Sequence, residues 1–116
     1  MLARWEQQPF EVWGTGEQTR SFLYIDDCID AVRQLMRSEC KTILNIGSEE
    51  KVTINELANM VLYGEHDVKL THIDGPIGVN GRVSDNTLIR SELGWEPKYS
   101  LQEGMRITYD WIKDKM

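Results

Sequence analysis

Two short runs of strand-forming residues lie near the start of the chain. Hydrophobic and polar positions alternate along residues 10–13 (FEVW), and residues 21–25 (SFLYI) form the second run. Such runs are typical of half-buried strands. The connection between them, residues 14–19 (GTGEQT), contains glycines and has the length of a loose hairpin loop. The pattern therefore predicts two strands that pair as a hairpin.

The hydrophobic spacing changes to that of a helix over residues 26–37. Apolar side chains recur there three and four positions apart, at Cys28, Ile29, Val32, Leu35 and Met36. Asp26 is predicted as the N-cap and Asp27 as a favourable charge in the first turn, because carboxylates stabilise the free N–H groups of a helix start. Residues 43–46 (ILNI) then predict a further strand. A strand, a helix and a strand in this order indicate an α/β arrangement.

A capping box marks the next helix. Thr53 and Glu56 have the spacing at which each side chain binds the other residue's backbone N–H. Gly64 is predicted to end this helix. Residues 68–73 (VKLTHI) then alternate as a strand, and residues 74–82 (DGPIGVNGR) form a glycine-rich loop.

Two further helices are predicted in the last third of the chain. Ser84 or Asp85 is expected to cap a short helix that ends near Gly94. A second capping box, formed by Ser100 and Glu103, opens the final helix.

The composition indicates one small folded domain. The chain of 116 residues is 41% hydrophobic and 28% charged, and it shows no repeat, linker or low-complexity tract. Residues 1–116 are therefore predicted to form a single α/β domain with short strands and about four helices. The net charge of −6 argues against a general nucleic-acid binder, which needs a basic face. A small anionic ligand is still compatible with this charge, because one or two arginines can bind it locally.

The chain carries no sign of export or membrane insertion. No apolar run approaches the roughly 20 residues of a membrane helix, and the N-terminus lacks the apolar core of a signal peptide. Cys28 and Cys40 have neither metal-binding nor redox spacing. We therefore expect a cytoplasmic protein with reduced thiols, without a membrane or a nucleic acid among its partners.

Residues for catalysis or metal binding are few. Asp26 and Asp27 are adjacent, and neighbours on a helix do not face each other. His66 and His72 have no cysteine or carboxylate cluster at metal-ligand spacing. No serine lies in a nucleophile elbow. The sequence therefore predicts neither a catalytic residue nor a metal site.

Two arginines are candidates for binding an anion. Arg20 follows the glycine-containing turn, and Arg82 stands at the end of the glycine-rich loop. A guanidinium holds a phosphate by two parallel hydrogen bonds, so two arginines on separate loops can clamp a diphosphate. The alternative is that each is a solvated loop charge.

Five motifs occur in a characteristic order: QTRSF, YIDDC, NIGS, GRxSDN and LGW. In this order and at these spacings, residues 10–112 resemble the C-terminal part of extended short-chain dehydrogenase/reductases that act on nucleotide sugars. These are the NAD-dependent epimerases and dehydratases, and within them the likeness is greatest to the GDP-mannose 3,5-epimerases.

The resemblance implies roles for particular residues. Gln18 and Arg20, from the QTR motif, would contact the nucleotide sugar. Arg82, from GRxSDN, would bind its diphosphate. Asp85 would reach the nucleotide ribose, although helix capping explains this residue too.

The chain departs from the family pattern in two respects. In the family, an N-terminal Rossmann domain holds NAD and a Tyr-x-x-x-Lys catalytic pair. This sequence has no strand-linked glycine fingerprint, and only Tyr109 and Lys113 fit the spacing of the pair, at the end of the last predicted helix. We therefore expect no cofactor and no catalytic residue in this chain alone.

Three functions follow as hypotheses. The first is part of a nucleotide-sugar epimerase that keeps a portion of the GDP-sugar site and is inactive alone. The second is a stand-alone module that binds a nucleotide or a partner. The third is an oligomeric structural remnant without a ligand.

Two kinds of protein partner are expected besides the nucleotide sugar. Without a Rossmann sheet, the helix over residues 26–37 and the strand at residues 43–46 would leave apolar surface and an unpaired edge. The chain is therefore expected to associate with a Rossmann-domain partner or with itself, most simply as a symmetric homodimer.

Overall fold

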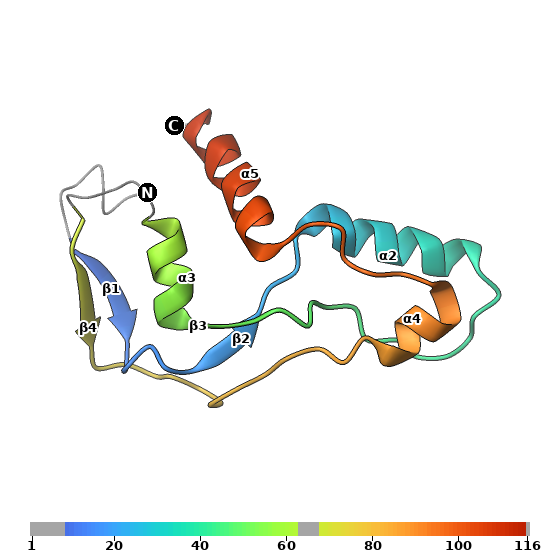
Figure 1. Ribbon diagram of the computed structural model, residues 1–116, viewed down its shortest axis with the longest axis horizontal. Helices are drawn as coiled ribbons and strands as arrows, with labels where there is room; N and C mark the ends of the chain where they lie inside the picture. Colours follow the sequence, from blue (N-terminus) through green and yellow to red (C-terminus); the bar gives the residue numbers. More distant parts are fainter. Residues whose placement is uncertain (1–8, 63–67, 116) are drawn as a thin grey trace. The chain divides into compact units, whose positions relative to one another are not determined.

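The computed structural model describes residues 9–62 and 68–115 (Figure 1). Within these ranges the chain forms β1 (Phe10–Trp13), β2 (Thr19–Ser21), α2 (Ile25–Arg37), β3 (Lys51–Thr53), α3 (Ile54–Val61), β4 (Leu70–Ile73), α4 (Thr87–Leu93) and α5 (Leu101–Lys113). Short strands and helices thus alternate, which confirms the α/β prediction. The predicted helix end at Gly64 lies outside the described residues, as does His66.

The chain divides into two compact units, each built from two separate segments. Unit 1 combines the residues up to Arg20 with Val52–Arg82, and unit 2 combines Ser21–Lys51 with the residues from Val83 onward. The single domain expected for residues 1–116 stays a prediction.

In unit 1, β1 pairs in parallel with β4. Phe10 lies opposite Leu70, and Trp13 lies opposite Ile73. The other two strands, β2 and β3, form a second two-stranded sheet. The predicted hairpin between residues 10–13 and 21–25 is therefore wrong. The Gly14 N–H continues the β1–β4 ladder by donating to the Ile73 carbonyl at 2.8 Å, so a strand from later in the chain takes the hairpin partner's place.

The predicted capping box at the start of α3 is confirmed. The Glu56 N–H donates to Thr53 Oγ1 at 3.1 Å, and the Thr53 N–H donates to Glu56 Oε2 at 2.7 Å. Behind it, α3 contacts β1, and Ala58 and Val12 are buried in unit 1.

The core of unit 2 is a cluster of three buried residues, Ala31, Ile89 and Trp95. Partly buried side chains complete it: Leu23, Leu44, Ile46 and Leu93. The core thus joins α2, α4 and the irregular segments beside them.

The start of α2 differs from the prediction. Its N-cap is Tyr24, which makes no side-chain cap, so the assignment of Asp26 as N-cap is wrong. Asp27 is 1% exposed, and its two carboxylate oxygens accept the backbone N–H groups of Lys98 and Tyr99 at 3.0 and 3.1 Å. The residue therefore joins α2 to the segment before α5.

The second predicted strand, residues 21–25, is also shorter than expected. The strand β2 ends at Ser21, and α2 already begins at Ile25. The apolar run thus divides between a strand end and a helix start.

Residues 43–46 have the side-chain alternation of a strand but no ladder. Leu44 and Ile46 pack on the core, whereas Ile43 and Asn45 point outward. Among the described residues, no backbone hydrogen bond joins this segment to another. The strand predicted at residues 43–46 is therefore absent. The segment has the alternating side chains of a strand, but no strand among the described residues pairs with its backbone.

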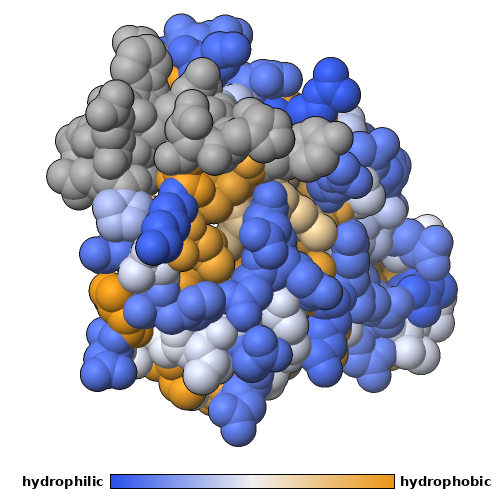
Figure 2. Space-filling view, turned by 60° about the vertical axis from the view of Figure 1, so that its left-hand side comes forward, coloured by the Kyte–Doolittle hydropathy of each residue, from blue (hydrophilic) through white to orange (hydrophobic). Residues whose placement is uncertain are grey.

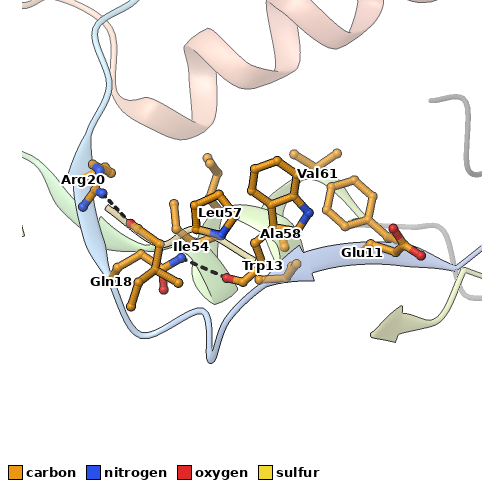
Figure 3. A pocket seen from close by; sticks show the side chains of 12 residues that line it. Glu11, Trp13, Gln18, Arg20, Ile54, Leu57, Ala58 and Val61 are labelled. Carbon is orange, nitrogen blue, oxygen red and sulfur yellow. Dashed lines mark hydrogen bonds between the residues drawn. The ribbon is translucent and has the colours of Figure 1, made fainter. Parts of the chain in front are cut away.

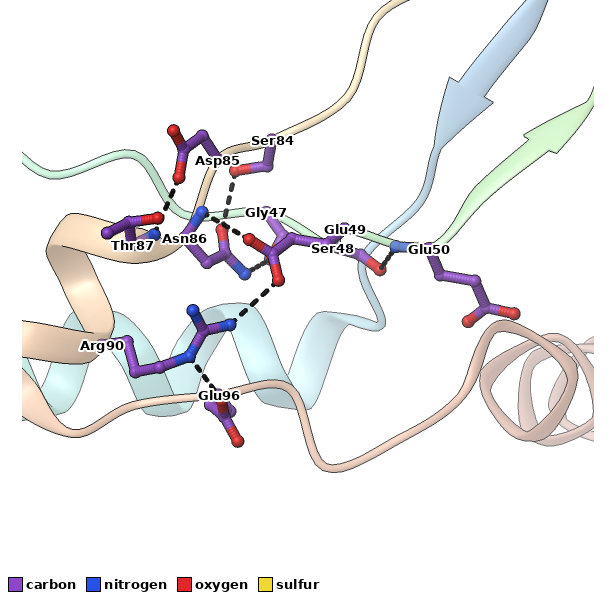
Figure 4. A network of polar contacts seen from close by, with 10 residues as sticks. All are labelled: Gly47, Ser48, Glu49, Glu50, Ser84, Asp85, Asn86, Thr87, Arg90 and Glu96. Atoms are coloured by element: carbon purple, nitrogen blue, oxygen red, sulfur yellow. Dashed lines mark hydrogen bonds and ion pairs between the residues drawn. The ribbon is translucent and has the colours of Figure 1, made fainter.

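A polar network precedes α4 (Figure 4). Asn86 is fully buried: its Nδ2 donates to the Gly47 carbonyl at 2.9 Å, and its Oδ1 accepts the Ser84 hydroxyl at 2.8 Å. Its backbone N–H donates to Glu49 at 3.0 Å and is the main cause of the lowered pKa of that carboxyl. Arg90 adds ion pairs to Glu49 and Glu96.

The predicted end of α4 and the predicted start of α5 are both confirmed. Gly94 ends α4 in the left-handed conformation, at φ 62°. Ser100 and Glu103 form the predicted capping box of α5. Among the described residues, no helix has both the length and the apolar character needed to cross a membrane.

Candidate functional site

A pocket of about 380 Å³ lies in unit 1 (Figure 3). Its walls come from β1, from the turn leading into β2, from β2 itself, from α3 and from the loop after β4. The lining residues are Phe10, Glu11, Val12, Trp13, Gln18, Arg20, Ile54, Leu57, Ala58, Val61, Pro76 and Ile77. A mostly apolar wall with a few polar groups is typical of small-molecule sites.

The turn after β1 leads to two of the three polar residues of the pocket, Gln18 and Arg20, whereas Glu11 lies on β1 itself. Gly14 and Gly16 adopt φ values of 72° and 74°, which non-glycine residues rarely tolerate. A Cβ on Gly16 would overlap the Oδ1 atom of Asn55. The Asn55 N–H donates to the Gly16 carbonyl at 3.0 Å, so the turn is fixed against the start of α3.

Gln18 lines the pocket and carries an unused acceptor. Its Nε2 donates to the Trp13 carbonyl at 3.2 Å, which fixes the orientation of the amide. Its Oε1 is buried and has no hydrogen-bond partner among the described residues. Buried polar atoms in native proteins are nearly always paired, so this oxygen is suited to a donor on a ligand.

Arg20 is half-buried and partly committed to the protein. Its Nη1 donates to the Thr19 carbonyl at 2.7 Å, and its Nη2 donates to the Ile77 carbonyl at 3.2 Å. Gly78 lies beside the guanidinium, since a Cβ there would stand 3.5 Å from Nη2. A guanidinium has five N–H donors, so these two contacts orient it and leave donors for an anion.

Trp13 is a lining residue that the sequence reasoning did not select. The indole lies against Gly75, where a Cβ would come within 2.7 Å of the ring, and the side chain is still 54% exposed. The signal for it was available, because alternation along β1 places Trp13 on the face opposite the buried Val12. The sequence alone does not show that the loop after β4, which contains Gly75, lies beside Trp13.

Arg82 lies next to the strand that carries Arg20. Its backbone N–H donates to the Thr19 carbonyl at 3.2 Å, and Gly81 forms a parallel bridge with Thr19. Its side chain is exposed. The structure therefore brings Gln18, Arg20 and the backbone of Arg82 together in one unit.

Asp85 belongs to unit 2 and takes part in the start of α4. Its Oδ1 accepts the Thr87 N–H at 2.9 Å. Hydrogen bonds from the side chain and then the backbone of Thr87 lower the pKa of the Asp85 carboxyl. The predicted N-cap at Ser84 or Asp85 is therefore wrong, because the N-cap of α4 is Asn86; the Asp85 carboxylate still accepts the N–H of Thr87, the first residue of the helix.

No metal site is found within residues 9–62 and 68–115, where no three His, Cys, Asp or Glu side chains gather closely enough. His72 is exposed, and its Nε2 lies 2.8 Å from Asn55 Oδ1. His72 thus contacts the same Asn55 whose backbone N–H binds the Gly16 carbonyl of the glycine turn.

Hydrophobic side chains are visible on the surface seen in Figure 2, between hydrophilic ones. The exposed apolar residues of unit 1 include Trp13, Ile77 and Val79. Trp13 and Ile77 thus give the pocket exposed apolar lining beside its three polar side chains, Glu11, Gln18 and Arg20.

Comparison with known proteins identifies relatives over nearly the whole chain. Residues 2–108 match the family described as GDP-mannose 4,6 dehydratase. GDP-mannose 3,5-epimerase from Arabidopsis thaliana is 52% identical over 108 residues, which cover 92% of this chain and 29% of the relative. GDP-L-fucose synthase 1 from the same plant is 42% identical over 103 residues, covering 86% of this chain and 32% of the relative. The chain thus spans about three tenths of the length of these relatives.

Solved structures show the same relationship. UDP-glucose 4-epimerase from Thermotoga maritima superposes with a TM-score of 0.89 at 27% identity, over 97% of this chain and 37% of that one. UDP-glucuronic acid 4-epimerase from Bacillus cereus gives a TM-score of 0.87 at 26% identity, over 98% and 38%. The family resemblance drawn from the ordered motifs is therefore confirmed, and the chain belongs to the GDP-mannose 4,6 dehydratase family of NAD-dependent nucleotide-sugar epimerases and dehydratases.

Proposed function

We propose that this chain supplies the nucleotide-binding portion of a GDP-sugar epimerase or dehydratase, and that the pocket of unit 1 receives the nucleotide. The observation that carries the proposal is that Gln18, whose Oε1 is buried and unpaired among the described residues, lines the same pocket as Arg20. Family membership supports the ligand class.

The chemistry of the pocket fits a nucleotide diphosphate in three respects. The free donors of Arg20 bind phosphate oxygens in parallel, and Arg82 adds a second guanidinium from the adjoining segment. Gln18 Oε1 accepts a hydrogen bond from a ring N–H or a hydroxyl group. The open face of Trp13 offers a planar apolar surface for a heteroaromatic ring.

Catalysis requires groups beyond this pocket. The NAD site and the catalytic pair of the family have no counterpart that we could recognise in this sequence, so the chain is proposed to be inactive alone. Asp85 is proposed as a ribose contact from the resemblance, with its present contact to Thr87 as the competing role.

Calorimetric titration with GDP-mannose, GDP and UDP-glucose tests the proposal. GDP-mannose and GDP are expected to bind. Replacing Arg20 with Ala should weaken binding by roughly 10- to 100-fold, as expected for a lost charge-assisted hydrogen bond. Arg20→Lys keeps the charge but not the paired donors and should recover only part of the affinity.

Matched variants separate the pocket from general charge effects. Arg37→Ala removes the same charge from the exposed end of α2 in unit 2 and should leave binding unchanged. Gln18→Leu should weaken binding without a change in net charge. Absence of heat and of any shift in melting temperature at millimolar GDP-mannose would refute the nucleotide site and favour the structural remnant.

A further inference from the structure

The glycine turn, residues 14–17, is attached to the start of α3 through backbone hydrogen bonds. The Asn55 N–H donates to the Gly16 carbonyl at 3.0 Å, and the Ile54 N–H donates to the Gln18 carbonyl at 3.1 Å. The first N–H groups of a helix have no acceptor within the helix. The turn and the residue after it supply these acceptors, so the start of α3 and the turn stabilise each other.

The side chain of Asn55 holds the same turn at two further points. Its Nδ2 donates to the Thr15 carbonyl at 3.0 Å and to Glu17 Oε1 at 3.2 Å. A carbonyl and an ionised carboxylate only accept hydrogen bonds, so a flipped amide would place Asn55 Oδ1 against two acceptors. The contacts with the turn therefore determine the orientation of the amide. Asn55 thus binds three consecutive residues of the turn, 15, 16 and 17.

His72, on β4, contacts the remaining atom of the Asn55 amide. Its Nε2 lies 2.8 Å from Asn55 Oδ1. Because this oxygen only accepts, His72 Nε2 carries the hydrogen and donates it. Three segments of unit 1 therefore meet at one amide: the glycine turn, the first turn of α3 and β4.

We propose that Asn55 is a positioning residue of the pocket and that His72 fixes its amide in place. Gly14 and Gly16 have positive φ, and glycine restricts the conformation of a turn less than any other residue. External contacts must therefore hold the turn that leads to Gln18 and Arg20. Asn55 is not among the described residues that line the pocket, so it affects a ligand only through the turn. The inference rests on the nucleotide site proposed above, but the docking of the turn is measurable without a ligand.

The variant Asn55→Asp tests the proposal with little change in shape. It keeps the acceptor for His72 and replaces the donor by an oxygen that faces the Thr15 carbonyl and the Glu17 carboxylate. We expect it to weaken the binding of GDP-mannose about 10-fold in calorimetric titration. Asn59→Asp makes the same chemical change at an exposed position of the same helix and should bind like the parent.

Hydrogen exchange at positions 54 and 55 measures the docking of the turn directly. The acceptors of these two backbone amides lie outside α3, so release of the turn exposes both amides to water. They should exchange at least about 10-fold faster in Asn55→Asp than in the parent or in Asn59→Asp. The amide of Leu62 donates to the Ala58 carbonyl within the helix. Its exchange should be the same in all three proteins, which would show that α3 itself is intact.

Second-site and conservative changes separate positioning from a general loss of stability. Glu17→Gln, added to Asn55→Asp, supplies a side-chain N–H for the new carboxylate and should restore most of the binding and of the protection. His72→Gln offers an amide N–H in place of Nε2–H and should keep most of the affinity. His72→Phe has a ring without a donor and should resemble a milder form of Asn55→Asp.

Unchanged exchange at positions 54 and 55 in both Asn55→Asp and His72→Phe would overturn the proposal. Faster exchange together with the affinity of the parent for GDP-mannose would also overturn it. A parent chain that binds no GDP-mannose would refute the nucleotide site, and the exchange comparison would still decide whether Asn55 holds the turn. If Asn55→Asp does not fold, His72→Phe and His72→Gln provide the same comparison from β4.

Discussion

The carboxylate of Asp27 connects two parts of unit 2 that are distant in sequence. Each oxygen accepts one backbone N–H, from Lys98 and from Tyr99, in a site closed to water. The neighbouring Asp26 is exposed and makes no such contact. Asp26 and Asp27 thus have different structural roles, and only the folded structure shows which of the two is buried and hydrogen-bonded.

Replacing Asp27 with Asn should destabilise the chain by about 1–3 kcal/mol, because the amide nitrogen cannot accept the second N–H and leaves a buried donor unpaired. Asp26→Asn makes the same chemical change at an exposed position and should cost less than about 0.5 kcal/mol. Urea unfolding of both variants measures the difference. Equal stabilities would show that the Asp27 contacts contribute nothing.

At the residue scale, the sequence selected two of the residues that line the pocket, Gln18 and Arg20, but not Trp13. The first two belong to a motif that can be recognised without the fold. The environment of Trp13 is made by Gly75, which lies beside it only because β4 pairs with β1. A residue whose role depends on a long-range pairing gives little local signal.

At the scale of elements, both capping boxes are correct and two strand predictions fail. A capping box is closed within four residues, so its hydrogen bonds are determined locally. A strand requires a partner, and neither the β1–β4 pairing nor the unpaired state of residues 43–46 can be read from an alternating pattern. These two strand errors therefore lie where backbone groups must find distant partners, whereas the wrong N-cap at Asp26 is a local error, because α2 begins at Ile25 with Tyr24 as its N-cap.

The capping boxes should make stability depend on pH below about 4.5. Hydrogen bonds from Ser100, first from its hydroxyl and then from its backbone, lower the pKa of Glu103 below its ordinary value of 4.5. The Thr53 backbone N–H and then its hydroxyl do the same for Glu56. A carboxyl with a lowered folded-state pKa stabilises the fold above the unfolded pKa, and this contribution is lost as pH falls through the folded pKa.

The variant Glu103→Gln should therefore lose less unfolding free energy than the parent when the pH falls from about 5 to about 2.5, because glutamine does not titrate. Thermal melts across this range provide the measurement. Glu92→Gln is a suitable control on α4, since Glu92 is exposed and outside any capping box. Parallel melting curves for parent and Glu103→Gln would contradict the expectation.

At the scale of the molecule, the chain passes between the two units at residues 20–21, 51–52 and 82–83. Because three covalent passages connect the units, we expect them to unfold in one transition, as a single domain does. The motif GRxSDN is itself divided, with Arg82 in unit 1 and Ser84, Asp85 and Asn86 in unit 2.

The variant Ile89→Ala tests this cooperativity. Ile89 is 1% exposed in the core of unit 2, so the truncation should cost about 2–5 kcal/mol. If the units unfold together, the slowest-exchanging amides of β1 in unit 1 should exchange faster by the same free energy. Faster exchange confined to unit 2 would show two independently unfolding units.

The interleaving of the segments also has a consequence for synthesis on the ribosome. Unit 1 contains no described residue beyond Arg82, whereas unit 2 needs α4, Trp95 and the contacts that Asp27 makes with Lys98 and Tyr99. The buried core partners of α2, Ile89 and Trp95, are translated well after the helix itself. We expect the nascent chain to carry α2 with its apolar side chains uncovered until the final third has left the exit tunnel, which makes this helix the natural contact for chaperones during translation.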